Sequence, residues 1–318
     1  MKIFWALLFS LFLSPWAAAQ DGGYPNRPIR FIVPFTPGAG ADIAARFFGK
    51  QLASELGQSV VVDNRPGAFG AVSAAAVKNA DADGYTLFLG SNSPMTVNPV
   101  VVKNLSYDPV RDFKPVSGLT RNTNVIIVPE NSKLKTLADL VAAAKAAPHP
   151  LNAGTPASGY HLVMEWFAST AGVKFNHIPY KGGALCYGDV VGGQLDLAVG
   201  ELAGTAQYIR NGRMRLLAVT NEKRHRDFPD VPAVNESFPG FVTFPWNALF
   251  VRTGTPEPIT RKLAHTMQKI LASDAAKEFV GRVGTELLPL APEAMRKFQL
   301  DEIARFQRIA DAAGIKPQ

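Results

Sequence analysis

The residues that could do chemistry begin with a glycine-rich stretch between Pro34 and Asp42. An apolar run at 31–33 predicts a strand that ends at Pro34, and Gly38 and Gly40 follow it. Asp42 then stands where the N-cap of a helix is expected. A strand, a glycine loop and a helix start can bind an anion, because helix N-termini carry unpaired N–H groups and partial positive charge. We therefore expect the main chain at 36–42 to bind a carboxylate.

Signatures of nucleotide binding and of catalysis are incomplete in this sequence. The G-x-G-x-x-G pattern begun by Gly38 and Gly40 has Ile43 at its third glycine, and no P-loop, G-x-S-x-G or H-E-x-x-H is present. His161 and Glu165 lie four residues apart, but no third metal ligand stands at a recognisable spacing. We interpret this pair as a hydrogen bond on a helix surface. The sequence thus indicates no enzyme, metal or cofactor, and catalytic residues that converge only in space are an alternative.

Composition and charge place the chain among ordinary globular proteins. Its 318 residues are 47% hydrophobic and 19% charged, which suits two domains of typical size. The net charge of +7 comes from scattered basic residues without a basic stripe interleaved with aromatics, so we expect no nucleic-acid partner. A modest positive field would instead help to collect anionic solutes. The single cysteine, Cys186, cannot form an intrachain disulfide, and we expect a monomer.

The first 19 residues predict a secretory signal peptide. Lys2 is followed by an apolar core at 3–13 and by small residues that end with Ala17 and Ala19. A core of this length is too short to span a bilayer, so an uncleaved anchor is the less favoured alternative. No later segment reaches about 18 unbroken apolar residues. We therefore expect an exported, periplasmic mature protein.

Strands and helices alternate on both sides of the glycine loop. A helix at 41–56, a strand at 60–62, a helix at 71–80 and a strand at 85–89 complete a βαβαβ unit, the unit of a doubly wound sheet. A second series is predicted as a helix at 158–172, a strand at 173–178, a helix at 184–191 and a strand at 195–199. Placing Gly67 on Gly182, an offset of 182 − 67 = 115, aligns the two series and indicates two copies of one α/β unit.

Two such units are expected to form two lobes on either side of a cleft. Ligands of open α/β sheets bind outside the carboxyl ends of the strands, so both lobes would contribute loops to this cleft. Strands at 124–128 and 248–251 would connect the lobes, and helices at 258–272 and 292–313 would pack back on the first. We expect lobe 1 at 20–123 and 246–318, lobe 2 at 124–245, and a hinge near 121–124 and 244–247.

Motifs along the mature chain carry a resemblance to a known family. They are Y-P-N-R-P-I-R-F-I-V-P-F at 24–35, P-G at 37–38 with Asp42, V-D-N-R-P-G-A at 62–68, D-G-Y-T-L at 83–87, P-Y-K-G at 179–182, G-G-Q-L-D at 192–196, L-A-V-T at 217–220 and P-D-V-P at 229–232. Together they resemble the Bug-type periplasmic solute-binding proteins of tripartite tricarboxylate transporters. The resemblance implies a two-lobed α/β fold of type II-like periplasmic binding proteins and delivery of small carboxylates to a membrane permease. A receptor that signals to a membrane sensor is an alternative that uses the same cleft.

The loop positions and the resemblance together predict the ligand-binding residues. These are Thr36, Gly38, Ala39, Gly40, Ala41, Asp42, Ser91 and Asn92 in the first lobe, and Ser158, Gly159, His161, Lys181, Gly182, Gly183 and Glu201 in the second. The main-chain N–H groups of the first loop would hold the ligand carboxylate. For Ser158, the alternative role is to cap its own helix.

Three departures from the family pattern bear on the choice of ligand. Ala39 replaces a glycine, Thr155 and Ala157 replace two more, and Gly200-Glu201 stands where the family often has Asp-Asn. Glu201 would repel a carboxylate unless a ligand amine or a neutral amide lies against it. The expected ligand is therefore a dicarboxylate, an amino acid or an acid that bears an aromatic or amide group.

Overall fold

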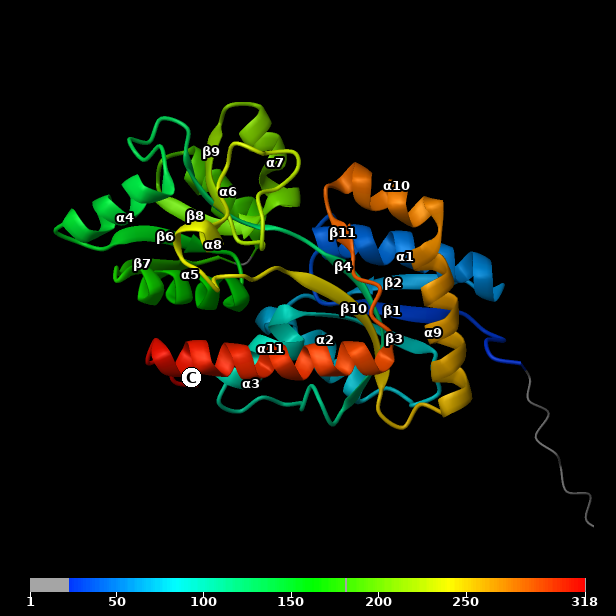
Figure 1. Cartoon of the computed structure of the whole chain (residues 1–318). Coiled ribbons are helices and arrows are strands. Elements are labelled where there is room, and N and C mark those ends of the chain that lie inside the picture. Colours follow the sequence, from blue (N-terminus) through cyan, green and yellow to red (C-terminus); the bar gives the residue numbers. More distant parts are fainter. Residues whose placement is uncertain (1–22, 181, 318) are drawn as a thin grey trace, which may run out of the picture.

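The computed structural model describes residues 23–180 and 182–317, and its strands form two separate sheets (Figure 1). The predicted signal peptide and Lys181 lie outside the described residues. Helices pack against both sheets, so the expected mixed α/β architecture is present. Within the described residues, no helix is long and apolar enough to span a membrane.

The first sheet contains the predicted βαβαβ unit. Its strand order is β11-β4-β10-β3-β1-β2, and β1 pairs in parallel with β2 and β3. The strands are β1 (Ile29–Val33), β2 (Val60–Asn64), β3 (Thr86–Ser91), β4 (Phe113–Arg121), β10 (Trp246–Arg252) and β11 (Glu286–Leu287). The accompanying helices are α1 (Gly40–Leu56), η1 (Ala68–Gly70), α2 (Ala71–Lys78), η2 (Ser93–Val97), α3 (Asn98–Val101), α9 (Glu257–Ala272), α10 (Asp274–Val283) and α11 (Pro292–Ala312).

The second sheet has the order β7-β6-β8-β5-β9, with β6 parallel to both β7 and β8. Its strands are β5 (Asn124–Pro129), β6 (Leu151–Thr155), β7 (Phe175–Pro179), β8 (Leu197–Glu201) and β9 (Met214–Val219). Its helices are α4 (Leu137–Ala146), α5 (Ser158–Ala171), α6 (Gly183–Val191), α7 (Leu202–Arg210) and α8 (Val234–Ser237). The predicted helix–strand–helix–strand series corresponds to α5, β7, α6 and β8, whereas β6 and β9 were not predicted.

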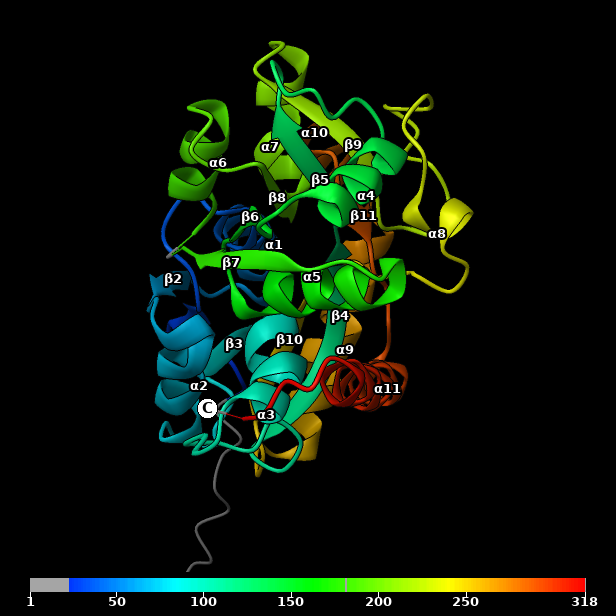
Figure 2. The same ribbon diagram turned by 90° about the vertical axis from the view of Figure 1, so that its left-hand side faces the viewer.

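Two chain segments connect the sheets, and they are joined to each other. The chain leaves the first sheet where β4 ends at Arg121 and returns where β10 begins (Figure 2). The main-chain N–H of Asn122 donates to the carbonyl of Pro245 at 2.8 Å. The side chain of Asn92, directly after β3, accepts from the N–H of Trp246 at 2.7 Å and donates to the carbonyl of Phe244 at 3.2 Å. The connection is therefore fixed to the carboxyl end of β3.

The long helix α11 contacts both halves of the molecule. It packs on β4, η2 and α3 beside the first sheet, and on α5 beside the second (Figure 1). Phe306 of α11 and Leu162 of α5 belong to one buried apolar cluster with Val97. Both C-terminal helices pack on the first lobe as predicted, since α9 contacts β4 and α1 and α11 contacts β4. The contact of α11 with α5 was not predicted.

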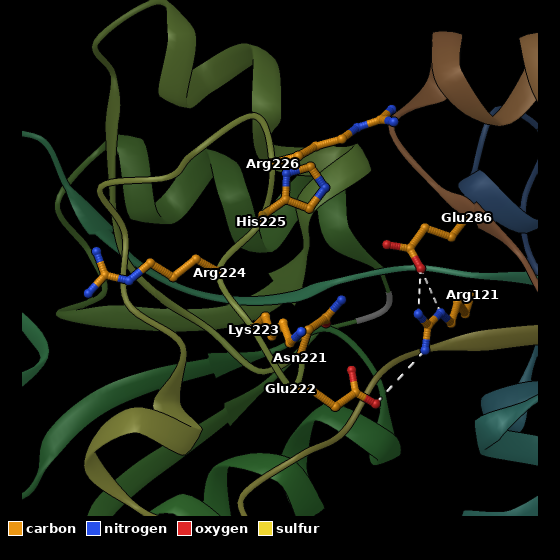
Figure 3. A pocket seen from close by; sticks show the side chains of 8 residues that line it. All are labelled: Arg121, Asn221, Glu222, Lys223, Arg224, His225, Arg226 and Glu286. Carbon is orange, nitrogen blue, oxygen red and sulfur yellow. Dashed lines mark hydrogen bonds and ion pairs between the residues drawn. The ribbon is translucent and has the colours of Figure 1, made fainter.

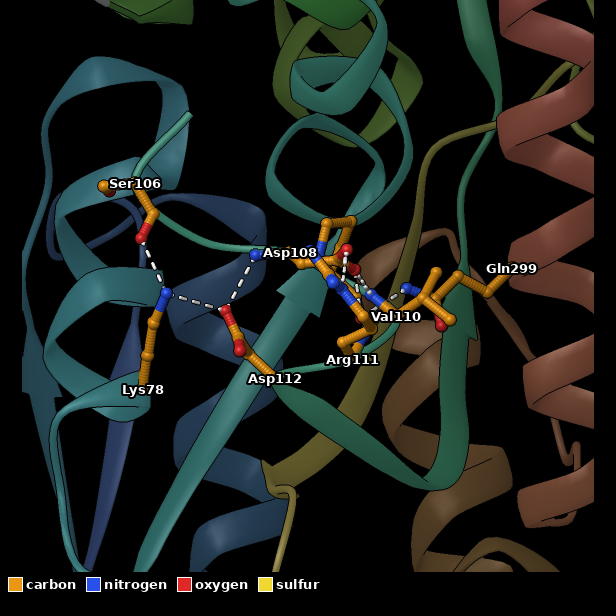
Figure 4. Close-up of polar contacts among 8 residues, drawn as sticks. Lys78, Ser106, Asp108, Val110, Arg111, Asp112 and Gln299 are labelled. Atoms are coloured by element: carbon orange, nitrogen blue, oxygen red, sulfur yellow. Dashed lines mark hydrogen bonds and ion pairs between the residues drawn. The ribbon is translucent and has the colours of Figure 1, made fainter. Parts of the chain in front are cut away.

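A polar loop before β4 anchors α11 to the first sheet (Figure 4). Lys78 of α2 donates to the carbonyl of Ser106 at 2.9 Å and pairs with Asp112 at 3.0 Å. The buried amide of Gln299, on α11, donates to the carbonyls of Pro109 at 3.1 Å and of Met95 at 3.2 Å. Because Met95 lies in η2, the helix is tied to the segment that directly follows β3.

Candidate functional site

The start of α1 is organised around Asp42, but not as predicted. Asp42 is not the N-cap, which is Ala39, so the expected cap role is wrong. Asp42 lies in the first turn of the helix, and its carboxylate accepts from the N–H of Gly38 at 2.9 Å, from Arg46 at 2.9 Å and from Asn64 at 2.8 Å. Burial acts to raise the pKa of Asp42, but these hydrogen bonds outweigh it and hold the pKa below its ordinary value. The charged carboxylate thus fixes the loop from inside the protein.

This arrangement leaves donors free at the helix start. In the described part of the chain, the main-chain N–H groups of Gly40, Ala41 and Asp42 have no hydrogen-bond partner. Gly38 has φ +84°, which requires glycine, whereas Ala39 has φ −67° and ψ 156°, which any residue adopts. The alanine at position 39 therefore causes no backbone strain, and the loop can present these donors to an anion.

Glu201 reaches from the end of β8 to the start of α1. Its Oε2 lies 3.3 Å from the place that a Cβ on Gly40 would take, and the same oxygen accepts from the Asn122 amide at 2.9 Å. Its Oε1 accepts from the Tyr160 hydroxyl at 2.6 Å. Burial raises the pKa of Glu201, and the hydrogen bonds from Tyr160 and Asn122 oppose this shift only in part. A carboxyl group of the second sheet thus meets the helix N-terminus of the first.

Two tyrosines support Glu201. Burial first, and then the nearby charge of Glu201, raise the pKa of Tyr160, so its hydroxyl stays a hydrogen-bond donor at neutral pH. The hydroxyl of Tyr187 accepts from the main-chain N–H of Glu201 at 3.2 Å. A Cβ on Gly183 would lie 2.7 Å from the Tyr187 ring, and one on Gly200 would overlap the same ring. These glycines therefore make room for the tyrosine that holds the end of β8.

The remaining first-lobe candidates differ in their surroundings. Ser91, at the end of β3, is buried, and its hydroxyl has no hydrogen-bond partner among residues 23–180 and 182–317. The amide of Asn92 is already used by the connecting segments, as described above. Thr36 is exposed, and its carbonyl accepts from the N–H of Ala39 at 3.2 Å. Among the three candidates Thr36, Ser91 and Asn92, Ser91 is thus the one whose buried side chain lacks a hydrogen-bond partner.

The start of α5 lies against the first lobe. The hydroxyl of Ser158 donates to the side chain of Asn98 at 3.3 Å instead of capping its own helix, whose N-cap is Ala157. A Cβ on Gly159 would lie 3.7 Å from the Ser93 hydroxyl oxygen, an ordinary contact. Thr155 lies in β6 and Ala157 has an extended φ of −161°, so neither position requires the family's glycine.

The other second-lobe candidates fall into two places. Gly182 has φ +138° and is the N-cap of α6, and Gly183 is the first residue of that helix. His161 instead packs against His177, with ring centroids 4.3 Å apart and ring planes tilted by 32°. Lys181, between these groups in the sequence, is outside the described residues.

Three residues near Glu201 were not predicted: Asn122, Tyr160 and Tyr187. Tyr160 stands between the predicted Gly159 and His161, so its position in the first turn of α5 was the available signal. Tyr187 is suggested only by the small residues around it, Gly183 and Gly200. No sequence signal marks Asn122, because its role arises from the path of the chain between the sheets.

A separate pocket lies between the end of β4 and the loop after β9 (Figure 3). Arg121 pairs there with Glu286 at 2.6 Å and with Glu222 at 3.9 Å. The lining residues are Arg121, Asn221, Glu222, Lys223, Arg224, His225, Arg226 and Glu286. None of the predicted ligand-binding residues lines this pocket. Its ion pairs instead connect the end of β4 to β11 and to the loop after β9.

Comparisons with known proteins agree on one family. A family model described as the tripartite tricarboxylate transporter family receptor matches residues 44–315. Protein BugT of Bordetella pertussis is 35% identical over 92% of this chain and 91% of its own length. The structure of R. palustris Rpa4515 with adipate has a TM-score of 0.88 at 33% identity and covers 93% of this chain and 100% of that one. MatC of Rhodopseudomonas palustris with bound malate has a TM-score of 0.82 at 26% identity, over 90% and 99% of the two chains. The chain therefore belongs to the family of tripartite tricarboxylate transporter receptors.

Proposed function

We propose that this protein is a periplasmic receptor that binds a small carboxylate-bearing solute between its lobes and delivers it to a membrane permease. Its family consists of transporter receptors, and two similar structures hold adipate and malate. One observation carries the proposal. The free N–H groups of Gly40, Ala41 and Asp42 lie beside the Glu201 carboxyl group of the opposite lobe, so a solute with both an anionic group and a hydrogen-bond donor can be bound there by both lobes.

We further infer that the solute has a hydrogen-bond donor, such as an amine or an amide, which contacts Glu201. Two carboxylates about 4 Å apart repel by roughly 4 kcal/mol at an effective dielectric constant of about 20. The raised pKa of Glu201 eases this cost only where the carboxyl group is protonated. An ammonium group at the same distance gains a comparable energy. Amino acids and amide-bearing acids should therefore bind better than plain dicarboxylates.

The first experiment is a thermal-shift screen of the mature protein with malate, adipate, aspartate, glutamate and amide-bearing acids. A solute at about 100 times its Kd should stabilise the fold by about 2.7 kcal/mol. Absence of stabilisation by every acid would contradict the receptor proposal, and conversion of a bound solute to a product would indicate an enzyme. Uptake of the selected solute by cells with and without the permease subunits then tests delivery.

The second experiment replaces Glu201 with glutamine and measures affinity by calorimetry. Glu201→Gln should weaken the binding of an amine-bearing acid at least tenfold and should strengthen that of a plain dicarboxylate. Glu293→Gln, at an exposed position in the first turn of α11, removes one charge away from the site and is the matched control. Equal affinities of Glu201→Gln and wild type for both classes would refute the donor proposal, while the receptor proposal would stand.

A further inference from the structure

A cluster of three metal-ligating side chains lies on the second lobe, apart from Glu201. His161 and Glu165 are one turn apart on α5, and His177 comes from β7, the edge strand beside it. One potential ligand atom from each residue lies within 4.8 Å of the others. Glu165 Oε1 is 2.6 Å from His177 Nε2 and 3.6 Å from His161 Nε2. Two imidazoles and a carboxylate thus point at one place.

Hydrogen bonding alone accounts poorly for His177. Its side chain is only 13% exposed. Its Nε2 pairs with Glu165 Oε1 at 2.6 Å, but within the described residues its buried Nδ1 has no hydrogen-bond partner. Buried polar atoms normally have a partner, and a ring nitrogen with none carries a cost. A cation bound between the two imidazoles and Glu165 would take up the Nε2 lone pair and the carboxylate, which already face each other.

We propose that His161, Glu165 and His177 bind a first-row divalent transition metal, with Zn²⁺ as the reference ion. In a tetrahedral zinc site with bonds of about 2.0–2.1 Å, ligand atoms lie about 3.3 Å apart. The two measured separations of 2.6 and 3.6 Å lie on either side of this value, and all three ligand atoms lie within 4.8 Å of one another, so side-chain rotations could bring them to a common metal ion. Three protein ligands would leave one position open, to water or to another ligand.

The surroundings of His177 indicate that the metal binds with moderate affinity. A metal-bound histidine usually donates its second N–H to a protein acceptor, and loss of that support costs about 10–100-fold in affinity. Nδ1 of His177 has no such acceptor among the residues that the structure describes. We therefore expect micromolar binding, with Cu²⁺ and Zn²⁺ ahead of Mn²⁺. The metal would fix the start of α5, the segment that contacts Asn98 of the first lobe, to the edge strand of the second sheet.

The test uses the tag-free mature protein, stripped with a chelator and then titrated with Zn²⁺ by calorimetry and with Co²⁺ by visible absorption. We expect one site per chain and Co²⁺ bands of low-symmetry coordination by nitrogen and oxygen. His177→Gln and His161→Gln should each weaken binding at least tenfold. His265→Gln, at an exposed position on α9, should have no effect. Because the His161 side chain is 46% exposed, its variant should fold even if the His177 variant does not.

Two results would overturn the proposal. One is the absence of Zn²⁺ binding up to about 1 mM, which would indicate a His–Glu–His contact without metal. The other is wild-type affinity in His161→Gln, which would place the metal elsewhere. Neither result depends on the carboxylate ligand, so failure of this inference and failure of the proposed transport function can be told apart.

Discussion

Replacing Gly40 with alanine tests whether the start of α1 and Glu201 form one binding site. Gly40 lies in the helix without a positive φ, so alanine fits its backbone. The new methyl group would lie 3.3 Å from Glu201 Oε2, which is a tight contact. The substitution therefore disturbs the contact between the lobes and little else.

The size of the effect follows from how firmly Glu201 is bound. Its carboxyl oxygens accept from Asn122 at 2.9 Å and from Tyr160 at 2.6 Å, so it cannot move away freely. Overpacking of a filled site typically costs about 1–3 kcal/mol. We expect the empty protein to open at its hinge and relieve this contact, so that the cost falls on the ligand-bound state. Because about 1.4 kcal/mol is tenfold in affinity, Kd should then rise roughly 5- to 150-fold. The free energy of unfolding should change less, since alanine favours a helix over glycine by up to about 1 kcal/mol.

Calorimetry with the best solute of the screen measures the affinity, and urea unfolding of the empty protein measures the stability. Gly281→Ala is the matched control, because this helical glycine has nothing within 4 Å of its added Cβ. It should keep wild-type affinity while its stability stays equal or rises. If Gly40→Ala also binds like wild type, the solute does not require the start of α1 to approach Glu201, and the assignment of the site is wrong.

Three further predictions concern the same contacts. Tyr160→Phe removes a hydrogen bond to a carboxyl group and should lower the free energy of unfolding by about 1.5–3 kcal/mol in urea melts; an unchanged value would mean that this bond contributes nothing. Burial raises the pKa of Glu201, so the protonated carboxyl group stabilises the fold fully at low pH, and this stabilisation is lost as pH rises through the folded-state pKa. Glu201→Gln should therefore become more stable relative to wild type as pH rises from about 4. Parallel curves of stability against pH for the two proteins would contradict the raised pKa. Arg121→Gln breaks partly exposed ion pairs and should cost less than about 1 kcal/mol, with the difference shrinking in high salt; a larger loss that salt does not reduce would contradict a screened surface pair.

Local patterns predicted the elements around the glycine loop correctly, but they missed strands with unusual residues. β4 contains Pro115 and Gly118, which read as strand breakers in the sequence. In the structure, irregularities in the pairing of β4 with β10 place Pro115 opposite Phe250 and Gly118 opposite Ala248. Gly118 also has no room for a side chain, because a Cβ there would overlap the main chain of Leu288. Tertiary packing, which a sequence pattern does not contain, therefore decided this strand.

In the candidate site, too, contiguous features could be predicted from the sequence, whereas contacts made only by the fold could not. The loop before α1 could be predicted because its strand, glycines and helix start are contiguous. The role of Asp42 could not be predicted. A carboxylate at the N-cap and a carboxylate within the first turn give a similar sequence signal, and only the fold brings Asn64 beside Asp42. Likewise, the sequence pairs His161 with Glu165 through helical spacing, but His177 joins them only because β7 lies next to α5.

Glu201 departs from the family pattern, and its position in the structure restricts which ligands can bind. The helix N-terminus favours negative charge, and Glu201 already supplies a carboxyl group within contact distance of Gly40. A solute that enters must either move this group away or place a donor against it, since a second carboxylate would be repelled. Tyr160 and Asn122 hold the group in place, which disfavours the first course. We therefore propose that the second course sets the specificity, which would require an acid that also carries an amine or amide.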